Sequence, residues 1–494
     1  MGESVNSEME TKAQATEPAA QESVQAAVQK KTAVKIVAFV CNWCTYAGAD
    51  LAGTSRMQYR PNVRVVRLTC TGRIDPLFLI KAFENGADGV IVSGCHPGDC
   101  HYVAGNYHAR RRWVFFKSLL DFVGIDERRV FFSWVSASEA NKWAKLVDEA
   151  VETVTGLGPY TQYKMLTDTR RAWEPEMPWS EAWAPGIPEG VPLPEPTPLD
   201  LAVRAKAKEI LETGKAKVVI GYAWAKRQRR AVPVFVADPA ETDSLIFNAL
   251  CVNNLTNYLT RHAKDVKALG RPAVFVKGCD ARNLVVLQQE SQVRREDVTV
   301  IGVPCNGVVY RPETWQGHLT PETLSPKCAG CEVREPRNCD ETVVGEVHPL
   351  PAEGMSPIDS KIAEMDAQPS QVRWNFWMEQ FDRCIKCYAC RQVCPLCYCE
   401  RCITEKNQPQ WIDTSAHPEG NLSWNLIRAI HLAGRCTFCG ECDRACPVNI
   451  PLNLINRKLG LVAKEAYGYA AGMDPGSLPP MIVFKPDDKE NFIR

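Results

Sequence analysis

Short apolar runs alternate with longer amphipathic segments over the first part of the chain. The apolar runs are KIVAFVC, VRVVRLTC, GVIVSGC and RVFFSWV, and segments such as DPLFLIKAFENG and WVFFKSLLDFVG lie between them. Apolar runs of this length are typical of buried strands, whereas the longer segments are typical of helices. Their alternation predicts a parallel, doubly wound sheet covered by helices over residues 32–156.

The same alternation returns in the middle of the chain. A helix is predicted over Leu199–Thr213, ending at Gly214, and strands are predicted at KVVIGY, VPVFVA, PAVFVKGC and VTVIGVPC. This pattern predicts a second α/β domain over residues 199–345. Residues 381–460 are different, because they combine helical periodicity with a high density of cysteine. They are predicted to form a separate helical domain.

Four further segments lack a regular apolar period. They are predicted to be a disordered tail (1–31), a Pro- and Trp-rich linker (157–198), a connector (346–380) and a C-terminal tail (461–494). The linker carries five Trp and Tyr side chains, all between residues 160 and 183. Such side chains pack either on a partner's surface or on their own chain, and the sequence does not choose between these alternatives.

Charge and length exclude some classes of function. The 494 residues include 58 basic and 58 acidic side chains, so the formal net charge is zero. A broad nucleic-acid surface needs a basic surplus, so no nucleic-acid partner is predicted. No apolar run approaches the about 18 residues of a membrane span, and the first residues show no signal-peptide pattern. A cytoplasmic protein without a membrane span is therefore predicted.

The 22 cysteines are the most unusual feature of the composition. Disulfides in an oxidising compartment and metal-bound thiolates in a reducing one are the two explanations to compare. Many of these cysteines recur at C-x2-C spacings, which are spacings of metal clusters. Metal-bound thiolates are the interpretation that fits the spacing.

Two copies of the motif C-x2-C-x2-C-x3-C-P lie in the helical domain. In this spacing three thiolates come from one tight loop, and the fourth ligates the other cluster of the pair. The predicted 4Fe–4S ligands are therefore Cys384, Cys387, Cys390 and Cys446 for one cluster, and Cys436, Cys439, Cys442 and Cys394 for the second. Zinc ribbons use two separated C-x2-C pairs instead. Between the repeats, Ser423 is predicted to cap a helix that ends at Gly434.

Another group of cysteines follows the strands of the first domain. Each of the five lies at or just after the carboxyl end of a predicted strand: Cys41, Cys44, Cys70, Cys95 and Cys100. Such ends meet at one edge of a parallel sheet, so a metal cluster is predicted there. A structural role is the alternative, chiefly for Cys70. His96, His101 and His108 are interpreted as polar loop residues, with ligation as the alternative. Arg110–Arg112 form either a solvated face or a docking surface for an acidic partner.

At these residues the chain resembles a known family. CNWCTYAGADLAGTSRMQYRPNVRVVRLTCTGRIDP and GADGVIVSGCHPGDCHYVAGNYHARRR are similar to the delta subunit of the methyl-viologen-reducing hydrogenase, over about residues 33–155. The resemblance implies one 2Fe–2S cluster and electron transfer from a hydrogenase or formate dehydrogenase to an HdrA-like flavoprotein, that is, one of the heterodisulfide reductase type. The favoured ligands are Cys41, Cys44, Cys95 and Cys100, and the choice of four among five stays open.

The middle domain holds a third group of cysteines. Cys279 and Cys305 follow predicted strands, and Cys305 with Cys328, Cys331 and Cys339 makes a set of four thiolates. This segment resembles the beta subunits of deazaflavin-dependent hydrogenases and dehydrogenases, a resemblance that implies a 4Fe–4S cluster and flavin. No G-x-G-x-x-G follows a strand, which argues against FAD. Asp280 is predicted to cap a helix, with contact to a cofactor phosphate as the alternative for Asp280 and Arg282.

Four cysteines then remain. Cys251 lies in an apolar run and is predicted to be a core residue. Cys397, Cys399 and Cys402 are predicted to ligate a further cluster, with a fourth ligand from elsewhere such as Cys279. The chain would then hold one or two 4Fe–4S clusters beyond the ferredoxin pair.

The predicted fold class is α/β with a flavodoxin-like doubly wound parallel sheet, a second α/β domain and a helical dicluster ferredoxin domain of the heterodisulfide reductase type, as the resemblance of AIHLAGRCTFCGECDRACP suggests. The predicted function is electron transfer within a hetero-oligomeric, heterodisulfide reductase-like complex, of the kind that can perform flavin-based electron bifurcation. The alternatives are the flavin-containing beta subunit of a dehydrogenase that acts on a deazaflavin or nicotinamide coenzyme, and a zinc-stabilised scaffold.

Overall fold

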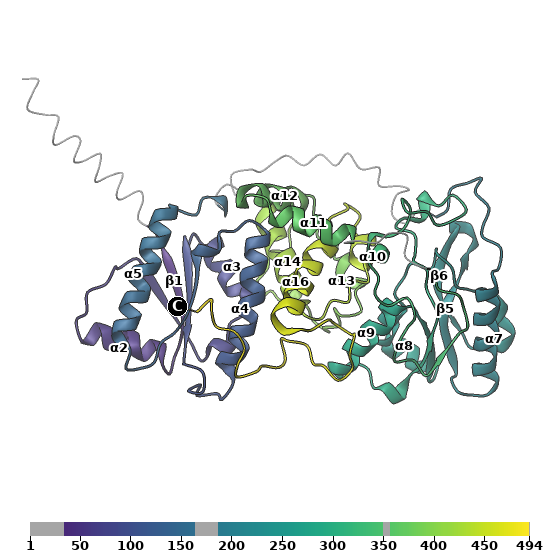
Figure 1. Ribbon diagram of the computed structural model, residues 1–494, viewed down its shortest axis with the longest axis horizontal. Helices are drawn as coiled ribbons and strands as arrows, with labels where there is room; N and C mark the ends of the chain where they lie inside the picture. The colour runs from purple at the N-terminus through teal and green to yellow at the C-terminus, as the bar shows by residue number, and fades with distance from the viewer. Residues whose placement is uncertain (1–33, 164–185, 349–355, 494) are drawn as a thin grey trace, which may run out of the picture. The chain divides into compact units, whose positions relative to one another are not determined.

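Figure 1 shows a computed structural model of the protein, which describes residues 34–163, 186–348 and 356–493. The predicted tail and the Trp residues of the predicted linker lie outside these ranges. The chain divides into two compact units, which are described separately below. The first comprises Met1–Ala109, Asp126–Thr169 and Glu490–Arg494, and the second comprises Arg110–Ile125 and Arg170–Lys489.

The first unit is built on a four-stranded parallel sheet with strand order β2-β1-β3-β4. Its strands are β1 (Ile36–Cys41), β2 (Val63–Leu68), β3 (Gly89–Gly94) and β4 (Val130–Trp134). Each coincides with one of the predicted apolar runs, so the doubly wound sheet is confirmed. Its helices are α2 (Thr45–Thr54), α3 (Pro76–Glu84), the start of α4 (Gly105–Phe122) and α5 (Ala140–Leu157).

Helices cover both faces of this sheet, with α2 and α5 on one side and α3 and the start of α4 on the other (Figure 1). Helix α5 presents an apolar stripe at helical spacing, in which Trp143, Val147 and Val154 are fully buried. Helix α3 begins at Pro76, where the side chain of Asp75 accepts a hydrogen bond of 2.9 Å from the backbone N–H of Leu77.

The start of the predicted linker packs on its own chain. The backbone N–H of Tyr160 donates to Asp88 at 2.7 Å, and the Tyr160 ring lies edge-on to Phe83 with 5.3 Å between centroids. Tyr163 is also buried, with its ring centroid 5.9 Å from that of Tyr160. For these two aromatic residues, packing on the same chain is the alternative that holds.

The second unit begins with a mixed sheet of strand order β10-β9-β8-β5-β6, with β7 also paired to β5. The strands are β5 (Val218–Ala225), β6 (Arg230–Val236), β7 (Leu245–Ile246), β8 (Pro272–Val276), β9 (Thr299–Gly302) and β10 (Glu341–Thr342). β5, β8, β9 and β10 run parallel, whereas β6 and β7 are antiparallel to β5. The helices here are α7 (Pro198–Glu212), α8 (Ala263–Ala268), α9 (Gly278–Gln289) and α10 (Pro326–Ala329). A second α/β domain is thus confirmed.

The rest of the second unit is helical. It contains α11 (Pro357–Asp366), α12 (Ser370–Asp382), α13 (Ala389–Gln392), α14 (Pro418–His431), α15 (Glu441–Arg444) and α16 (Leu452–Tyr467). The predicted connector over 346–380 missed α11 and most of α12. These two helices pack on α16 and α14, respectively. The pattern is hard to see in the sequence, because α11 buries only Ile362 and Met365 and the buried face of α12 includes polar side chains such as Arg373.

Helix α14 begins earlier than predicted. Pro418 is its first residue, and the His417 side chain accepts a hydrogen bond of 3.4 Å from the backbone N–H of Gly420. Ser423 is fully buried inside the helix, so its predicted role as the N-cap was wrong. Gly434 adopts a φ of +68° just after the helix, which agrees with the predicted end.

Two of the three arginines in Arg110–Arg112 are not available for docking. Arg110 and Arg111 are 1% and 3% exposed. Arg111 binds both carboxylate oxygens of Asp488, at 2.6 and 2.9 Å, and Arg110 donates to the carbonyl of Lys485 at 2.6 Å. The hypothesis of an acidic partner is therefore wrong for Arg110 and Arg111, because the C-terminal segment of the same chain already neutralises and covers them.

Trp377 in α12 anchors the helical part of the second unit. It is fully buried, its indole N–H donates to the carbonyl of Phe122 at 3.2 Å, and its ring lies 5.3 Å from that of Phe381. We expect Trp377→Ala to reduce the free energy of unfolding by about 3–5 kcal/mol, since it leaves a large cavity. Val372→Ala, on an exposed position of the same helix, should change it by less than about 0.5 kcal/mol. Urea unfolding followed by circular dichroism measures both, and equal effects would contradict the prediction.

Candidate metal centres

The two C-x2-C-x2-C-x3-C-P repeats fold into equivalent loops of the second unit. Cys390 lies in α13 and Cys442 in α15, and the two short helices contact each other. Lys386 and Phe438 adopt positive φ values of 51° and 61° at matching positions of the two loops, just before the second cysteine of each repeat. Non-glycine residues rarely adopt this conformation, which is found where a loop must wrap tightly around a site. The backbone therefore curls around each group of three cysteines.

The structure brings together the cysteines predicted for the first ferredoxin cluster. Burial, together with the nearby charges of Cys384, Cys446 and Cys387, raises the pKa of Cys390 to about 11. Cys384 interacts in the same way with Cys446 and Cys387. Cys446, although it belongs to the second repeat, thus lies with the first three cysteines of the first repeat.

The second set shows the reciprocal exchange. Burial and the charges of Cys436 and Cys439 raise the pKa of Cys442 well above its ordinary value. Cys394, from the first repeat, interacts with Cys439 of the second. This placement favours the predicted exchange of the fourth cysteines between the repeats, which stays a prediction for the cluster ligands.

The surroundings of these sulfurs fit iron–sulfur clusters. The backbone N–H of Ile450 donates to the sulfur of Cys446 at 3.4 Å, and the Asn456 amide lies 3.8 Å from the sulfur of Cys442. Donors to sulfur of this kind tune cluster potentials. Arg428 Nε and Thr437 Oγ1 are buried and find no hydrogen-bond partner among the described residues. Inorganic sulfide or thiolate beside them would supply an acceptor.

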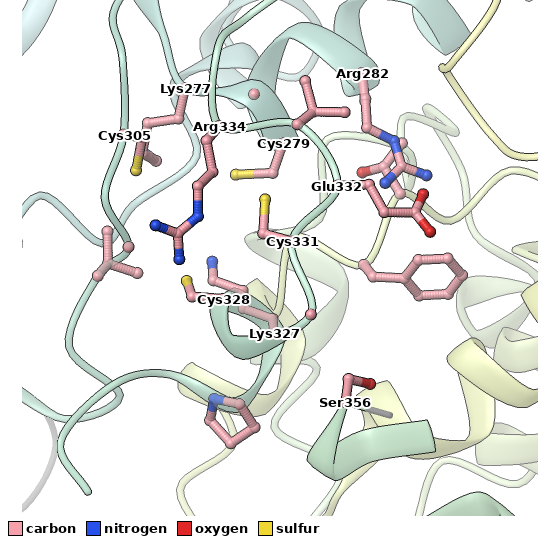
Figure 2. A pocket seen from close by; sticks show the side chains of 18 of the residues that line it. Lys277, Cys279, Arg282, Cys305, Lys327, Cys328, Cys331, Glu332, Arg334 and Ser356 are labelled. Atoms are coloured by element: carbon pink, nitrogen blue, oxygen red, sulfur yellow. The ribbon is translucent and has the colours of Figure 1, made fainter. Parts of the chain in front are cut away.

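A pocket of the second unit holds four more cysteines. Cys279 lies at the start of α9, Cys305 in the loop after β9, Cys328 in α10 and Cys331 just beyond it, and all four line the pocket (Figure 2). Four thiols from three segments are the donor set of a 4Fe–4S cluster. No three Cys, His, Asp or Glu side chains in the described ranges close in on one point as a single metal ion requires, whereas a cluster spreads its ligands over several iron atoms.

The structure differs here from the predicted set of Cys305, Cys328, Cys331 and Cys339. Cys339 does not line the pocket. Its sulfur lies near Gly302, at the end of β9, and within 3.5 Å of the carbonyl of Arg337. Cys279 lines the pocket instead, because it closely follows the carboxyl end of β8. This placement favours a role for Cys279 in the pocket over its predicted role as the fourth partner of Cys397, Cys399 and Cys402.

The pocket is lined by cationic side chains. Lys277, Arg282, Lys327, Arg334 and Arg457 all border it. Lys277 is 2% exposed and contacts the carbonyl of Asn253 at 2.7 Å and the carboxylate of Asp280 at 3.1 Å. Asp280 accepts a hydrogen bond from the backbone N–H of Lys277 at 3.1 Å, so it caps α9 as predicted. Arg282 donates to the carbonyl of Ala471 at 2.9 Å.

Sequence reasoning missed two cations next to the cysteine sets, the buried Arg428 and the half-buried Lys327. Arg428 in α14 donates to the carbonyl of Cys390 at 3.0 Å, and the Lys327 ammonium donates to the carbonyl of Cys439. Neither stands out in the sequence, although Lys327 directly precedes Cys328 and Arg428 lies in the helix that joins the repeats. Cys251 is fully buried in the core as predicted, and burial raises its pKa to about 12.

The first unit gathers its five cysteines at the carboxyl edge of its sheet, as predicted. The sulfurs of Cys41 and Cys95 are 3.4 Å apart, and those of Cys70 and Cys100 are 3.7 Å apart. Cys44 also lies within hydrogen-bonding reach of Cys95. The hydrogen bond from Cys95 lowers the pKa of Cys41 to about 6, while the pKa of Cys95 rises, because two crowded sulfurs share one proton.

Glycine permits this crowding behind Cys70. A Cβ atom on Gly105, the first residue of α4, would lie 2.3 Å from the sulfur of Cys70 and 3.4 Å from that of Cys100. A Cβ atom on Gly72 would meet the backbone of Gly105 at 2.8 Å. The close approach therefore requires residues without side chains at both positions.

Two histidines near this edge are engaged with protein side chains. His96 lies 2.6 Å from the carboxylate of Glu139, and His101 stacks on Trp43 with 3.8 Å between ring centroids. These contacts favour the interpretation of both as polar loop residues.

Two separate parts of the chain match known protein families. Residues 36–158 match the family described as methyl-viologen-reducing hydrogenase, delta subunit, and residues 380–450 match the 4Fe-4S dicluster domain. An iron-sulfur subunit of the F420-non-reducing hydrogenase vhc from Methanococcus voltae is 52% identical over 127 residues, which are 26% of this chain and 88% of that protein. The chain belongs to the methyl-viologen-reducing hydrogenase delta subunit family.

Two other relatives are also subunits of hydrogenase or heterodisulfide reductase complexes. An iron-sulfur subunit of the F420-non-reducing hydrogenase from Archaeoglobus profundus is 51% identical over 125 residues, which are 25% of this chain and 91% of that protein. One subunit of the ferredoxin/F420H2-dependent CoB-CoM heterodisulfide reductase from Methanosarcina acetivorans is 41% identical over 143 residues, 28% of this chain and 18% of that protein. Neither family match reaches residues 199–345, so the likeness of that segment to deazaflavin-dependent beta subunits stays a prediction.

Among the described helices, none combines the length and apolar character that a membrane crossing requires.

Proposed function

We propose that the protein relays electrons between a hydrogenase or formate dehydrogenase and an HdrA-like flavoprotein. It is an iron–sulfur electron-transfer subunit of a complex of the hydrogenase and heterodisulfide reductase type. Family membership and the named relatives support this assignment. The protein works in the reducing cytoplasm as part of a hetero-oligomer, consistent with its many free thiols. In this setting the flavoprotein partner is the site of flavin-based electron bifurcation.

The observation that carries the proposal is the contiguity of three cysteine sets in the second unit. The set of Cys384, Cys387, Cys390 and Cys446 adjoins the set of Cys394, Cys436, Cys439 and Cys442, because the repeats exchange their fourth cysteines. Cys279 of the pocket interacts electrostatically with Cys439. Bound clusters supply one-electron exchange, and the protein's part is to hold them close enough in series for an electron to pass.

The pocket formed by Cys279, Cys305, Cys328 and Cys331 binds a third 4Fe–4S cluster in this proposal. Its cationic lining supports the assignment, since four thiolates bring negative charge into a buried space. The described pocket offers no phosphate-binding glycine loop, and FAD is not part of the proposal.

The edge of the first unit holds a 2Fe–2S cluster. Cys41, Cys44, Cys95 and Cys100 remain the favoured ligands, with Cys70 as the fifth thiol. The short distance between the sulfurs of Cys41 and Cys95, 3.4 Å, supports pairing these two on one cluster.

We expect the anaerobically purified protein to contain about 14 iron atoms and a similar number of acid-labile sulfides, for one 2Fe–2S and three 4Fe–4S clusters. A further cluster at Cys397, Cys399 and Cys402 would raise the count to about 18. Iron and sulfide analysis with EPR of the reduced protein measures this. A colourless protein with zinc would contradict the proposal, and release of flavin by acid would favour the dehydrogenase alternative.

A further inference from the structure

A buried guanidinium lies between the two ferredoxin cysteine sets. Arg428 is 4% exposed, and one of its nitrogens donates to the carbonyl of Cys390 in the first set at 3.0 Å. Its charge also acts on Cys442 and Cys394 of the second set. Among the described residues, Arg428 pairs with no carboxylate, and its Nε has no hydrogen-bond partner.

A second cation joins the second ferredoxin set to the pocket. Lys327 borders the pocket beside Cys328, and its ammonium donates to the carbonyl of Cys439 in the second set. Gly440 leaves room for this side chain, because a Cβ atom there would lie 2.9 Å from Cδ of Lys327. The Lys327 charge interacts with Cys279 and Cys328 on one side and with Cys439 on the other.

Burying a charge without an opposite charge is costly. The acidic groups that act on Lys327 are Glu441, Asp280 and Asp443. Glu441 also pairs with Arg444 at 2.8 Å, and Asp280 pairs with Lys277 at 3.1 Å. Arg428 forms no ion pair among the described residues, although the charge of Asp443 acts on it. The cysteine thiolates would add balancing negative charge beside both cations once clusters are bound. Each electron added to a cluster increases this negative charge, so a nearby buried cation stabilises the reduced state.

We propose that Arg428 and Lys327 are positioning residues whose positive charges raise the reduction potentials of the neighbouring clusters. Arg428 lies between the two ferredoxin cysteine sets, and Lys327 lies between the second of these sets and the pocket. This inference rests on the proposed function, because it requires clusters at all three sets. It assigns to each cation a different pair of clusters. Arg428 acts on both ferredoxin clusters, and Lys327 acts on the pocket cluster and on the ferredoxin cluster held by Cys436, Cys439 and Cys442.

The test is an EPR-monitored redox titration of the full chain, purified anaerobically, with iron content measured on each sample. In Arg428→Gln, the ratio of reduced to oxidised cluster at a fixed potential should fall at least tenfold for both ferredoxin clusters, which is about 59 mV for one electron. Arg428→Lys keeps the charge and should recover most of this loss. Lys327→Gln should lower the ratio of reduced to oxidised cluster for the pocket cluster and for the ferredoxin cluster of Cys436, Cys439 and Cys442. It should leave this ratio unchanged for the cluster of Cys384, Cys387 and Cys390.

Arg373→Gln is the matched control. Arg373 is a buried arginine of the same unit that binds Asp121 at 2.6 Å and the carbonyl of Gln368 at 2.9 Å, away from the cysteine sets. Its substitution should leave every potential unchanged.

Unchanged potentials in Arg428→Gln with full iron content would overturn the inference, as would an equal shift in Arg428→Lys, which would indicate packing rather than charge. If Arg428→Gln loses iron, Lys327→Gln decides: shifted potentials support the inference, and unchanged ones overturn it. Absence of iron from the wild-type protein would instead refute the proposed function.

Discussion

Cys279→Ser is expected to remove about four iron atoms per chain, whereas Cys339→Ser leaves the iron content unchanged. The reason is their placement, since Cys279 lines the pocket with Cys305, Cys328 and Cys331, and Cys339 does not. A serine hydroxyl is a poor replacement for a thiolate at iron, so loss of one of four ligands should release the cluster. The two substitutions are chemically identical, which makes each the control for the other.

Iron and sulfide analysis checks this prediction, and EPR identifies which signal disappears. The remaining clusters should keep their signals, because the ferredoxin sets draw on other cysteines. Unaltered iron in Cys279→Ser together with loss in Cys339→Ser would restore the set expected from the sequence and contradict the pocket assignment.

Cys279 and Cys339 also show what could not be predicted from the sequence. The strand runs ending at Cys41, Cys95 and Cys279 were predictable, because apolar alternation is local and parallel strands share their carboxyl edge. The choice between Cys279 and Cys339 depends on how the loops after β8 and β9 fold over that edge. No local pattern encodes that path, so a set assembled from neighbours in sequence includes Cys339, which does not line the pocket, and omits Cys279, which does.

The ferredoxin ligands were predictable for a different reason. The spacing of the repeats itself encodes a loop that wraps a cluster and a fourth ligand that crosses over. In the structure Cys394 interacts with Cys439 and Cys446 with Cys384, as that spacing leads one to expect. The start of α14 was harder to predict, because His417 caps the helix, whereas serine is the commoner cap. Buried charges such as Arg428 were not predictable, since their meaning depends on cysteines that lie far apart in sequence.

The structure around Cys394 also concerns the three cysteines outside the repeats, Cys397, Cys399 and Cys402. The sulfur of Cys397 lies within hydrogen-bonding reach of the sulfur of Cys394, and the hydrogen bond lowers the pKa of Cys397 to about 5. The loop is held in place from the middle domain, because Arg261 donates to the carbonyl of Cys397 and Thr260 donates to that of Pro395 at 3.4 Å. Cys399, by contrast, is exposed. Cys397 is thus positioned beside a cluster ligand, separately from Cys399.

We therefore expect the two crossing ligands to respond differently to substitution. Cys446→Ser should remove about four iron atoms, because the structure places no spare thiol beside it among the described residues. Cys394→Ser should retain most of its iron, since Cys397 offers a thiolate next to the vacated position. The double substitution Cys394→Ser/Cys397→Ser should then lose the same four atoms as Cys446→Ser, and Cys397→Ser alone should lose none. Iron analysis of the four variants tests this, and full loss in Cys394→Ser alone would show that Cys397 cannot replace it. Cys397 would then be a structural thiol, held by Arg261 for packing and not for ligation.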